Sequence, residues 1–132
     1  MKFQDFKLYR NKNYIDGEWV DSDSGDTISV NNPANLKEIG TVPKCGTSET
    51  KKAIESANNA WPEWKAKSAR QRSEILRKWF DLIIKNKEEL AQIMTTEQGK
   101  PINESRGEIV YGASFIEWFS DCLLYTSPSP RD

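Results

Sequence analysis

The chain has 132 residues and a formal net charge of −1, so one domain is expected and there is no basic surplus to hold a nucleic-acid backbone. Histidine is absent, which excludes Ser-His-Asp and Cys-His catalysis and every zinc site that uses histidine. No apolar run is long enough to cross a membrane, and the first ten residues lack the apolar core of a secretory signal, so we expect a cytoplasmic protein.

Short extended segments are predicted in the first third of the chain. Asp16 and Gly17 stand between two short apolar runs, and an Asp-Gly pair in this setting is typical of a tight β-hairpin. Pro33 is expected to stop a later strand, because proline cannot donate to a β-ladder. The predicted strands are residues 13–15, 18–20, 27–30 and 39–42.

Apolar residues recur at helical spacing from residue 47 onward, which predicts four amphipathic helices. Four such helices need a surface to cover, and the predicted strands are too small to provide it, so we expect a missing partner surface. Gly99 is expected to end the third helix. The first predicted helix begins at a cap formed by Thr47 or Ser48 and ends at Trp61 and Pro62. The second begins after a cap at Ser68, the third runs from about Lys87 to Gln98, and the fourth begins near Pro101.

Five stretches in order resemble the beginning of an aldehyde dehydrogenase. The fourth stretch holds the E-Q-G-K-P signature of that family between two predicted helices, and the fifth resembles the succinate-semialdehyde dehydrogenase branch in particular. The resemblance runs from about residue 8 to residue 120. The stretches are residues 14–20 (YIDGEWV), 30–34 (VNNPA), 57–61 (ANNAW, followed by Trp64), 94–101 (MTTEQGKP) and 104–119 (ESRGEIVYGASFIEWF).

The resemblance implies an α/β fold, of which this chain supplies the N-terminal strands and helices. The helices would pack on a doubly wound sheet encoded downstream in a longer parent protein. Residues 1–120 are expected to form this N-terminal part, and residues 121–132, which contain Cys122, are expected to be a non-native or disordered tail without functional weight. The parent would oxidise an aldehyde, succinate semialdehyde by this resemblance, with NAD or NADP, and would be a homo-oligomer.

Family members use a cysteine thiolate, a glutamate that activates water and a dinucleotide-binding βαβ unit, and all of these lie downstream of this segment. The resemblance therefore implies no catalytic and no cofactor-binding residue here, and we expect the chain to be inactive alone. Cys45 is the candidate nucleophile, because members of this family use a cysteine thiolate. It lacks a histidine and the family's nucleophile signature, and Lys44 is its only adjacent cation, so we interpret it as a small, half-buried structural side chain.

Two sites carry over from the family residue by residue. The backbone carbonyls of Val30 and Asn31, with the Glu97 carboxylate, would bind a monovalent cation, for which hard oxygen ligands are suited. The alternative for Glu97 is an exposed carboxylate at a helix end. Gly107 and Tyr111 would line the substrate tunnel, and the alternative for both is ordinary helix packing.

A different class of function also fits part of the sequence. A stand-alone helical interaction module would explain the absence of histidine and of a dinucleotide loop, but it does not explain the ordered motifs. The reading frame beyond Asp121 distinguishes the two, because a downstream cysteine and glutamate in a dehydrogenase context would favour the enzyme and a native stop codon would favour the module.

Overall fold

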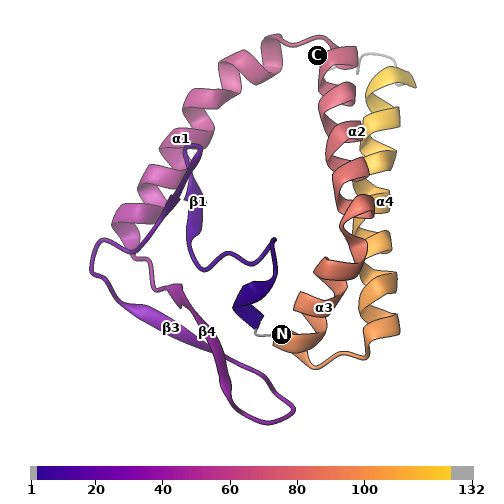
Figure 1. The fold of residues 1–132 in the computed structure, drawn as a ribbon. Coiled ribbons are helices and arrows are strands. Elements are labelled where there is room, and N and C mark those ends of the chain that lie inside the picture. The colour runs from indigo at the N-terminus through magenta and orange to yellow at the C-terminus, as the bar shows by residue number, and fades with distance from the viewer. Residues whose placement is uncertain (1–2, 126–132) are drawn as a thin grey trace.

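Short strands come first along the chain and helices follow, in the order that the sequence predicts (Figure 1). The structure is a computed structural model that describes residues 3–125. Within this range no helix is both long enough and apolar enough to cross a bilayer. After a turn of 3-10 helix, η1 (Phe3–Asp5), the elements are β1 (Asn13–Ile15), β2 (Glu18–Val20), β3 (Thr27–Asn31), β4 (Glu38–Pro43), α1 (Thr47–Ala66), α2 (Ala69–Lys85), α3 (Lys87–Gln98) and α4 (Ile102–Tyr125).

The predicted hairpin is confirmed, since β1 and β2 pair antiparallel across a two-residue turn. Asp16 and Gly17 have φ angles of 53° and 84°. Two successive positive φ angles are those of the hairpin turn that matches the twist of its strands, and Asp-Gly adopts them readily. Tyr14 and Trp19 face each other across the pair, with their ring centroids 5.1 Å apart.

A second antiparallel pair, β3 and β4, forms a separate two-stranded sheet. Its strands are slightly longer than predicted, and its register is interrupted between Val30 and Asn31. Such a bulge leaves a residue outside the regular ladder and bends the strand. The chain between the strands turns at Asn32, whose amide donates to the carbonyl of Lys37 at 2.9 Å.

The start of α1 differs from the prediction that Thr47 or Ser48 caps it. The residue before the helix is Gly46, and no side chain on it can accept the first amides. The Glu49 carboxylate reaches back instead and accepts from the backbone amide of Gly46 at 3.0 Å. A carboxylate in the first helical turn also suits the positive end of the helix dipole, so this half of a capping box is sufficient.

The predicted end of α1 at Trp61 and Pro62 is also wrong, because the helix continues through Pro62 to Ala66. Proline removes one intrahelical hydrogen bond and crowds the preceding turn, but it does not forbid the helix from continuing. An ion pair between Glu63 and Lys67, at 2.7 Å, supports the turn that follows the proline.

The starts of α2, α3 and α4 and the end of α3 agree with the sequence. Ser68 caps α2 and accepts from the amide of Gln71 at 3.3 Å, and Gly99 ends α3 with a φ of 78°. Helices α2 and α4 lie side by side along most of their lengths (Figure 1). Buried hydroxyl groups join them, since the Oγ atoms of Ser73 and Ser120 are 3.1 Å apart.

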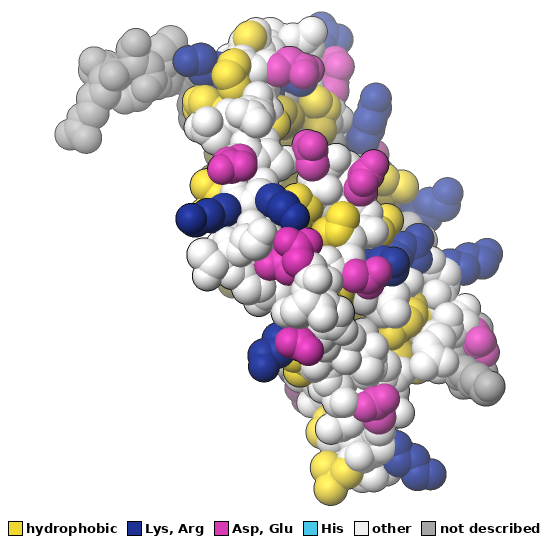
Figure 2. Space-filling view, turned by 90° about the vertical axis from the view of Figure 1, so that its left-hand side faces the viewer, with side chains coloured by type: hydrophobic (Ala, Val, Ile, Leu, Met, Phe, Trp, Pro, Cys, Tyr) yellow, Lys and Arg dark blue, Asp and Glu magenta, His cyan; other side chains and the backbone are white. Residues whose placement is uncertain are grey.

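The helices leave much apolar surface uncovered, as the sequence predicts. Among the described residues, the buried hydrophobic side chains are only Ala91 and Ala113. On the face that carries α1, acidic and basic side chains are interspersed and apolar side chains are exposed between them (Figure 2). Ile54 and Trp61 of α1 are 64% and 54% exposed. This arrangement is typical of a layer that lacks its covering partner.

Helix α4 extends past the boundary that the sequence suggested between residues 120 and 121. It runs to Tyr125, so the first five residues of the segment expected to be a tail are helical. Residues 126–132, with the two Ser-Pro steps on which that expectation rests, lie outside the described residues.

Candidate functional site

Segments that are far apart in the sequence converge at the C-terminal end of α3. The ring of Pro33, which follows β3, lies so close to Gly99 that a Cβ atom on this glycine would be 2.8 Å from the proline Cγ. The positive φ of Gly99 and the lack of a side chain are therefore both required at this position. This contact brings the end of β3 next to the end of α3.

A second close contact lies on the other strand of the same sheet. The Tyr9 hydroxyl occupies the space that a Cβ atom on Gly40 would need. Gly40 is the register partner of Val30, so the tyrosine ring lies over the strand pair at the level of Val30. No motif in the sequence indicates either Tyr9 or Gly40, because the contact is tertiary and joins residues without a periodic pattern.

Glu97 lies in the last turn of α3, near Tyr9. The residue is exposed as a whole, but partial burial of its carboxyl group raises its pKa above the ordinary value of 4.5. Burial also raises the pKa of the Tyr9 phenol, and the nearby charge of Glu97 raises it further. The structure thus brings Glu97, Tyr9 and the Gly40–Val30 pair into one region. A negative charge at the C-terminal end of a helix is unfavourable unless a positive group compensates it.

The chemistry of this region suits a cation of low charge. Within residues 3–125, no three Asp, Glu, Cys or His side chains converge as transition metals usually require. The region offers the Glu97 carboxylate and the backbone of the bulge at Val30 and Asn31. Carboxylate and carbonyl oxygens are hard ligands, so the residues fit an alkali cation better than zinc or iron.

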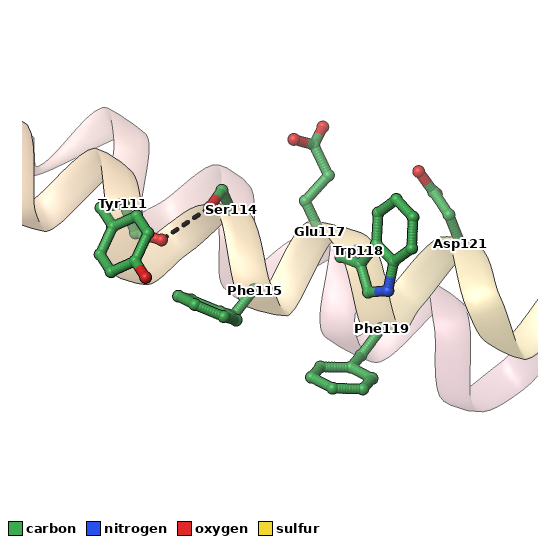
Figure 3. A pocket seen from close by; sticks show the side chains of 7 residues that line it. All are labelled: Tyr111, Ser114, Phe115, Glu117, Trp118, Phe119 and Asp121. Atoms are coloured by element: carbon green, nitrogen blue, oxygen red, sulfur yellow. Dashed lines mark hydrogen bonds between the residues drawn. The ribbon is translucent and has the colours of Figure 1, made fainter.

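The second predicted site lies on α4, along an open groove of about 590 Å³ (Figure 3). Tyr111 lines this groove, whereas Gly107, one turn earlier, does not. Tyr111 and Phe115 make an edge-to-face contact with ring centroids 4.9 Å apart, and the tyrosine is 66% exposed. The lining residues are Tyr111, Ser114, Phe115, Glu117, Trp118, Phe119 and Asp121.

The polar groups of this groove already have partners on neighbouring turns and on α2. The Glu117 and Asp121 carboxylates accept from the two ends of the Arg77 guanidinium, at 2.6 and 2.8 Å. The Ser114 hydroxyl donates to the carbonyl of Tyr111 at 2.7 Å. The groove therefore presents aromatic surface and no group arranged for acid–base chemistry.

Cys45 lies in the link before α1 and is half-buried, as the structural interpretation of this residue expects. Its Sγ atom accepts a hydrogen bond from Nδ2 of Asn13, at 2.8 Å. Both cysteines are among the described residues, and neither of them is in a disulfide. The Asn13 amide positions the thiol against the hairpin and does not act as a base toward it.

Comparison with known proteins agrees with the resemblance in the sequence. The model of the aldehyde dehydrogenase family matches residues 19–127. Over 121 residues the chain is 56% identical to a glutarate-semialdehyde dehydrogenase of Pseudomonas putida, a match that covers 92% of this chain and 25% of that protein. It is 50% identical over 121 residues to an NADP+-linked succinate-semialdehyde dehydrogenase of Escherichia coli, with the same coverage of both proteins.

The fold agrees as well. The crystal structure of succinate-semialdehyde dehydrogenase from Burkholderia pseudomallei superposes with a TM-score of 0.88 at 50% identity, over 96% of this chain and 27% of that one. The chain thus spans about a quarter of the length of the relatives that it matches. Short strands followed by four helices are the part of the larger fold that it shares. The chain belongs to the aldehyde dehydrogenase family and forms the N-terminal portion of its α/β fold.

Proposed function

We propose that the parent protein oxidises succinate semialdehyde to succinate, with NAD+ or NADP+ as the hydride acceptor and water as the source of the second carboxylate oxygen. The observation that carries this proposal is the identity of 56% and 50% to two relatives named for semialdehydes that end in a carboxylate. Glutarate semialdehyde, with one more methylene group, is the competing substrate. A pocket separates substrates that differ by one methylene group only by about 1–3 kcal/mol.

In this proposal the chain carries none of the reacting groups and is inactive alone. Cys45 is half-buried, and its sulfur accepts a hydrogen bond from an asparagine amide. The strands and helices of this chain would instead form one side of the enzyme and cover the part that binds the dinucleotide. The apolar side chains that α1, α2 and α4 expose support this role.

The test is an assay of the chain extended by its native downstream sequence. Reduction of NAD+ and of NADP+ is followed with succinate semialdehyde, glutarate semialdehyde and, as a control without a distal carboxylate, acetaldehyde. We expect the highest kcat/KM with succinate semialdehyde. A preference for glutarate semialdehyde would change the substrate but not the class, whereas no reduction with any aldehyde would refute the proposed reaction.

We also propose that Glu97, with the backbone carbonyls of Val30 and Asn31, binds Na+ or K+. The strand bulge, the partly buried carboxyl group and the position of Glu97 at the negative end of α3 support it. A bound cation would compensate the Glu97 charge and join two elements that come from different parts of the chain. Its role would be structural, because it would hold the end of β3 beside the end of α3.

On α4, we propose that Tyr111 borders the path by which the aldehyde enters, with Gly107 one turn earlier on the same helix. Tyr111 lines the aromatic groove, and the Cβ position of Gly107 has no neighbour within 4 Å, so both leave room for a small molecule. The Tyr111 side chain would thus face the incoming aldehyde.

The aromatic side chains around Tyr111 would also suit contacts between copies of the parent. We propose that the parent is a homo-oligomer and acts in the cytoplasm.

A further inference from the structure

We infer that Tyr9 is a positioning residue, which sits on Gly40 and fixes the end of β3 relative to Glu97. The inference rests on the proposed cation site, because it concerns the spacing between the two groups of ligands. The carbonyls come from β3 and the carboxylate from α3, and 55 residues of chain, residues 32–86, separate these elements. Something other than local chain geometry has to hold them at a fixed distance.

The segment from Phe3 to Tyr9 bridges the strand layer and the helix layer. On the strand side, Nε2 of Gln4 donates to the carbonyl of Ile39 in β4 at 3.2 Å. On the helix side, the backbone amide of Leu8 donates to Oε1 of Glu89 in α3 at 2.8 Å. The segment is therefore anchored to both layers within five residues.

Tyr9 stands at the end of this bridge. Its ring makes an edge-to-face contact with Phe3, at 4.9 Å between centroids, which fixes the orientation of the tyrosine. Its hydroxyl fills the space beside Gly40, opposite Val30 on the paired strand. Because any side chain on Gly40 would displace the hydroxyl, the glycine is what lets the bridge close onto the sheet.

The contact between Pro33 and Gly99 is a second link between the same two layers. Two links define an orientation better than one, since a single contact would leave the strand pair free to pivot. Groups that orient metal ligands without touching the metal change metal affinity by roughly 10–100-fold when they are mutated. The Tyr9–Gly40 contact is of this kind, because it touches β4, the strand paired with the one that carries the carbonyls, and not the cation itself.

The test asks whether a substitution of Tyr9 restores the cation binding that a substitution of Gly40 weakens. Gly40→Ala places a methyl group where the Tyr9 hydroxyl lies, and Tyr9→Phe removes that hydroxyl and leaves the ring carbon Cζ at 3.3 Å from the new methyl group. The two substitutions and their combination are made in the chain extended by its native downstream sequence, which without substitution serves as the unaltered chain. Gly112→Ala serves as the matched control, since a Cβ atom there meets nothing within 4 Å.

Two measurements are made on each protein. Sodium NMR line broadening, titrated with NaCl and with KCl as competitor, reports cation binding, and amide hydrogen exchange in β3, β4 and α3 reports whether the layers are in contact. We expect Gly40→Ala to weaken sodium binding roughly tenfold and to reduce protection in β3 and β4. We expect the double variant to regain most of the sodium affinity and most of the amide protection. We expect Gly112→Ala to match the unaltered chain in both measurements.

The outcomes separate this inference from the cation site. If the unaltered chain gives no sodium response, the cation site itself is refuted. If sodium binds but Gly40→Ala leaves the affinity unchanged, or if Tyr9→Phe does not restore it, the positioning role of Tyr9 is refuted while the cation site stands.

Discussion

The Glu49 carboxylate lies where the loop before β3 meets the first turn of α1. It accepts from the backbone amide of Asp23 at 2.6 Å and from that of Gly46 at 3.0 Å. These hydrogen bonds, that from Asp23 foremost, lower the pKa of Glu49 below its ordinary value. The residue is only 6% exposed. One carboxylate thus joins the loop before β3 to the first turn of α1.

Replacement of this carboxylate gives the first prediction. Glu49→Ala leaves both amides without their acceptor, and unsatisfied amides that are shielded from water destabilise the fold. We expect a lower thermal midpoint and faster amide exchange at Asp23 and Gly46. Glu55→Ala, on the exposed side of the same helix, is the control and should melt like the unaltered chain. Equal midpoints for the two variants would contradict the role given to Glu49.

An ion pair between α3 and α4 gives a prediction about pH. Hydrogen bonds from Arg106 and, at 3.3 Å, from Gln92 lower the pKa of Glu88 from 4.5 to about 2. Below pH 4.5 the unfolded chain binds this proton and the folded chain does not. The contribution of Glu88 to stability is therefore complete above pH 4.5 and is lost as the pH falls from there to about 2.

The matched variant is Glu88→Gln, which cannot ionise. We expect the chain to lose stability relative to this variant as the pH is lowered from 4.5 to 2, and we expect salt to weaken the difference because the pair is exposed. Thermal melts at a series of pH values, at low and high salt, measure it. Parallel pH profiles for the two proteins would show that the Arg106 pair is not formed.

At the scale of elements, the turn after α3 depends on Gly99. A side chain there would adopt a φ of 78° and its Cβ would lie 2.8 Å from Pro33. Left-handed backbone costs about 1–2 kcal/mol, and the clash adds to it, so we expect Gly99→Ala to lower the free energy of unfolding by about 2–3 kcal/mol. Urea denaturation followed by circular dichroism measures this.

Gly112 in α4 is the control for that substitution. A Cβ atom there meets nothing within 4 Å, and alanine favours the helix over glycine by about 0.5–1 kcal/mol. We therefore expect Gly112→Ala to be slightly more stable than the unaltered chain. If Gly99→Ala were also neutral or stabilising, the contact between β3 and α3 would be absent in solution.

Local signals in the sequence predicted most of the elements. The Asp16-Gly17 turn, the Ser68 cap and the Gly99 end of α3 each depend on neighbouring residues, so their structure can be derived from a short window. The prediction is wrong at Pro62, because the helix-forming residues on both sides of it outweigh the preference of one proline. It also failed at Gly46, because a side chain three residues later serves as the cap.

The candidate site was less predictable for a physical reason. Glu97, Val30 and Asn31 followed from resemblance to a family and not from any pattern that places a strand beside a helix end. The Tyr9–Gly40 contact joins residues 31 positions apart and depends on a glycine whose backbone is ordinary. Composition and periodicity carry no information about which distant residue will pack against a given glycine.

At the scale of the whole molecule, the exposed aromatic side chains decide how the chain behaves. Trp79 of α2 and Trp118 and Phe119 of α4 are 55%, 67% and 59% exposed. Each would gain roughly 1.5–3 kcal/mol on full burial, and domains of this size are stable by only about 5–15 kcal/mol. An isolated chain that forgoes several such burials keeps its helices but has little stability in reserve.

We therefore expect the isolated chain to be helical by far-ultraviolet circular dichroism, to bind a hydrophobic dye and to associate as its concentration rises. Dye fluorescence and analytical ultracentrifugation test this together. A monomer that binds no dye and melts in one sharp transition would show that the chain is a self-sufficient domain, which would favour a stand-alone interaction module over part of an enzyme.

The most direct test of the whole account is aldehyde-dependent reduction of NAD(P)+ by two proteins in the same assay. One is the 132-residue chain, and the other is residues 1–120 joined to the remaining part of the Escherichia coli succinate-semialdehyde dehydrogenase. We predict no turnover above the blank by the chain alone and clear turnover of succinate semialdehyde by the joined protein. Turnover by the chain alone that Cys45→Ser abolishes, or a folded joined protein without activity, would contradict the account.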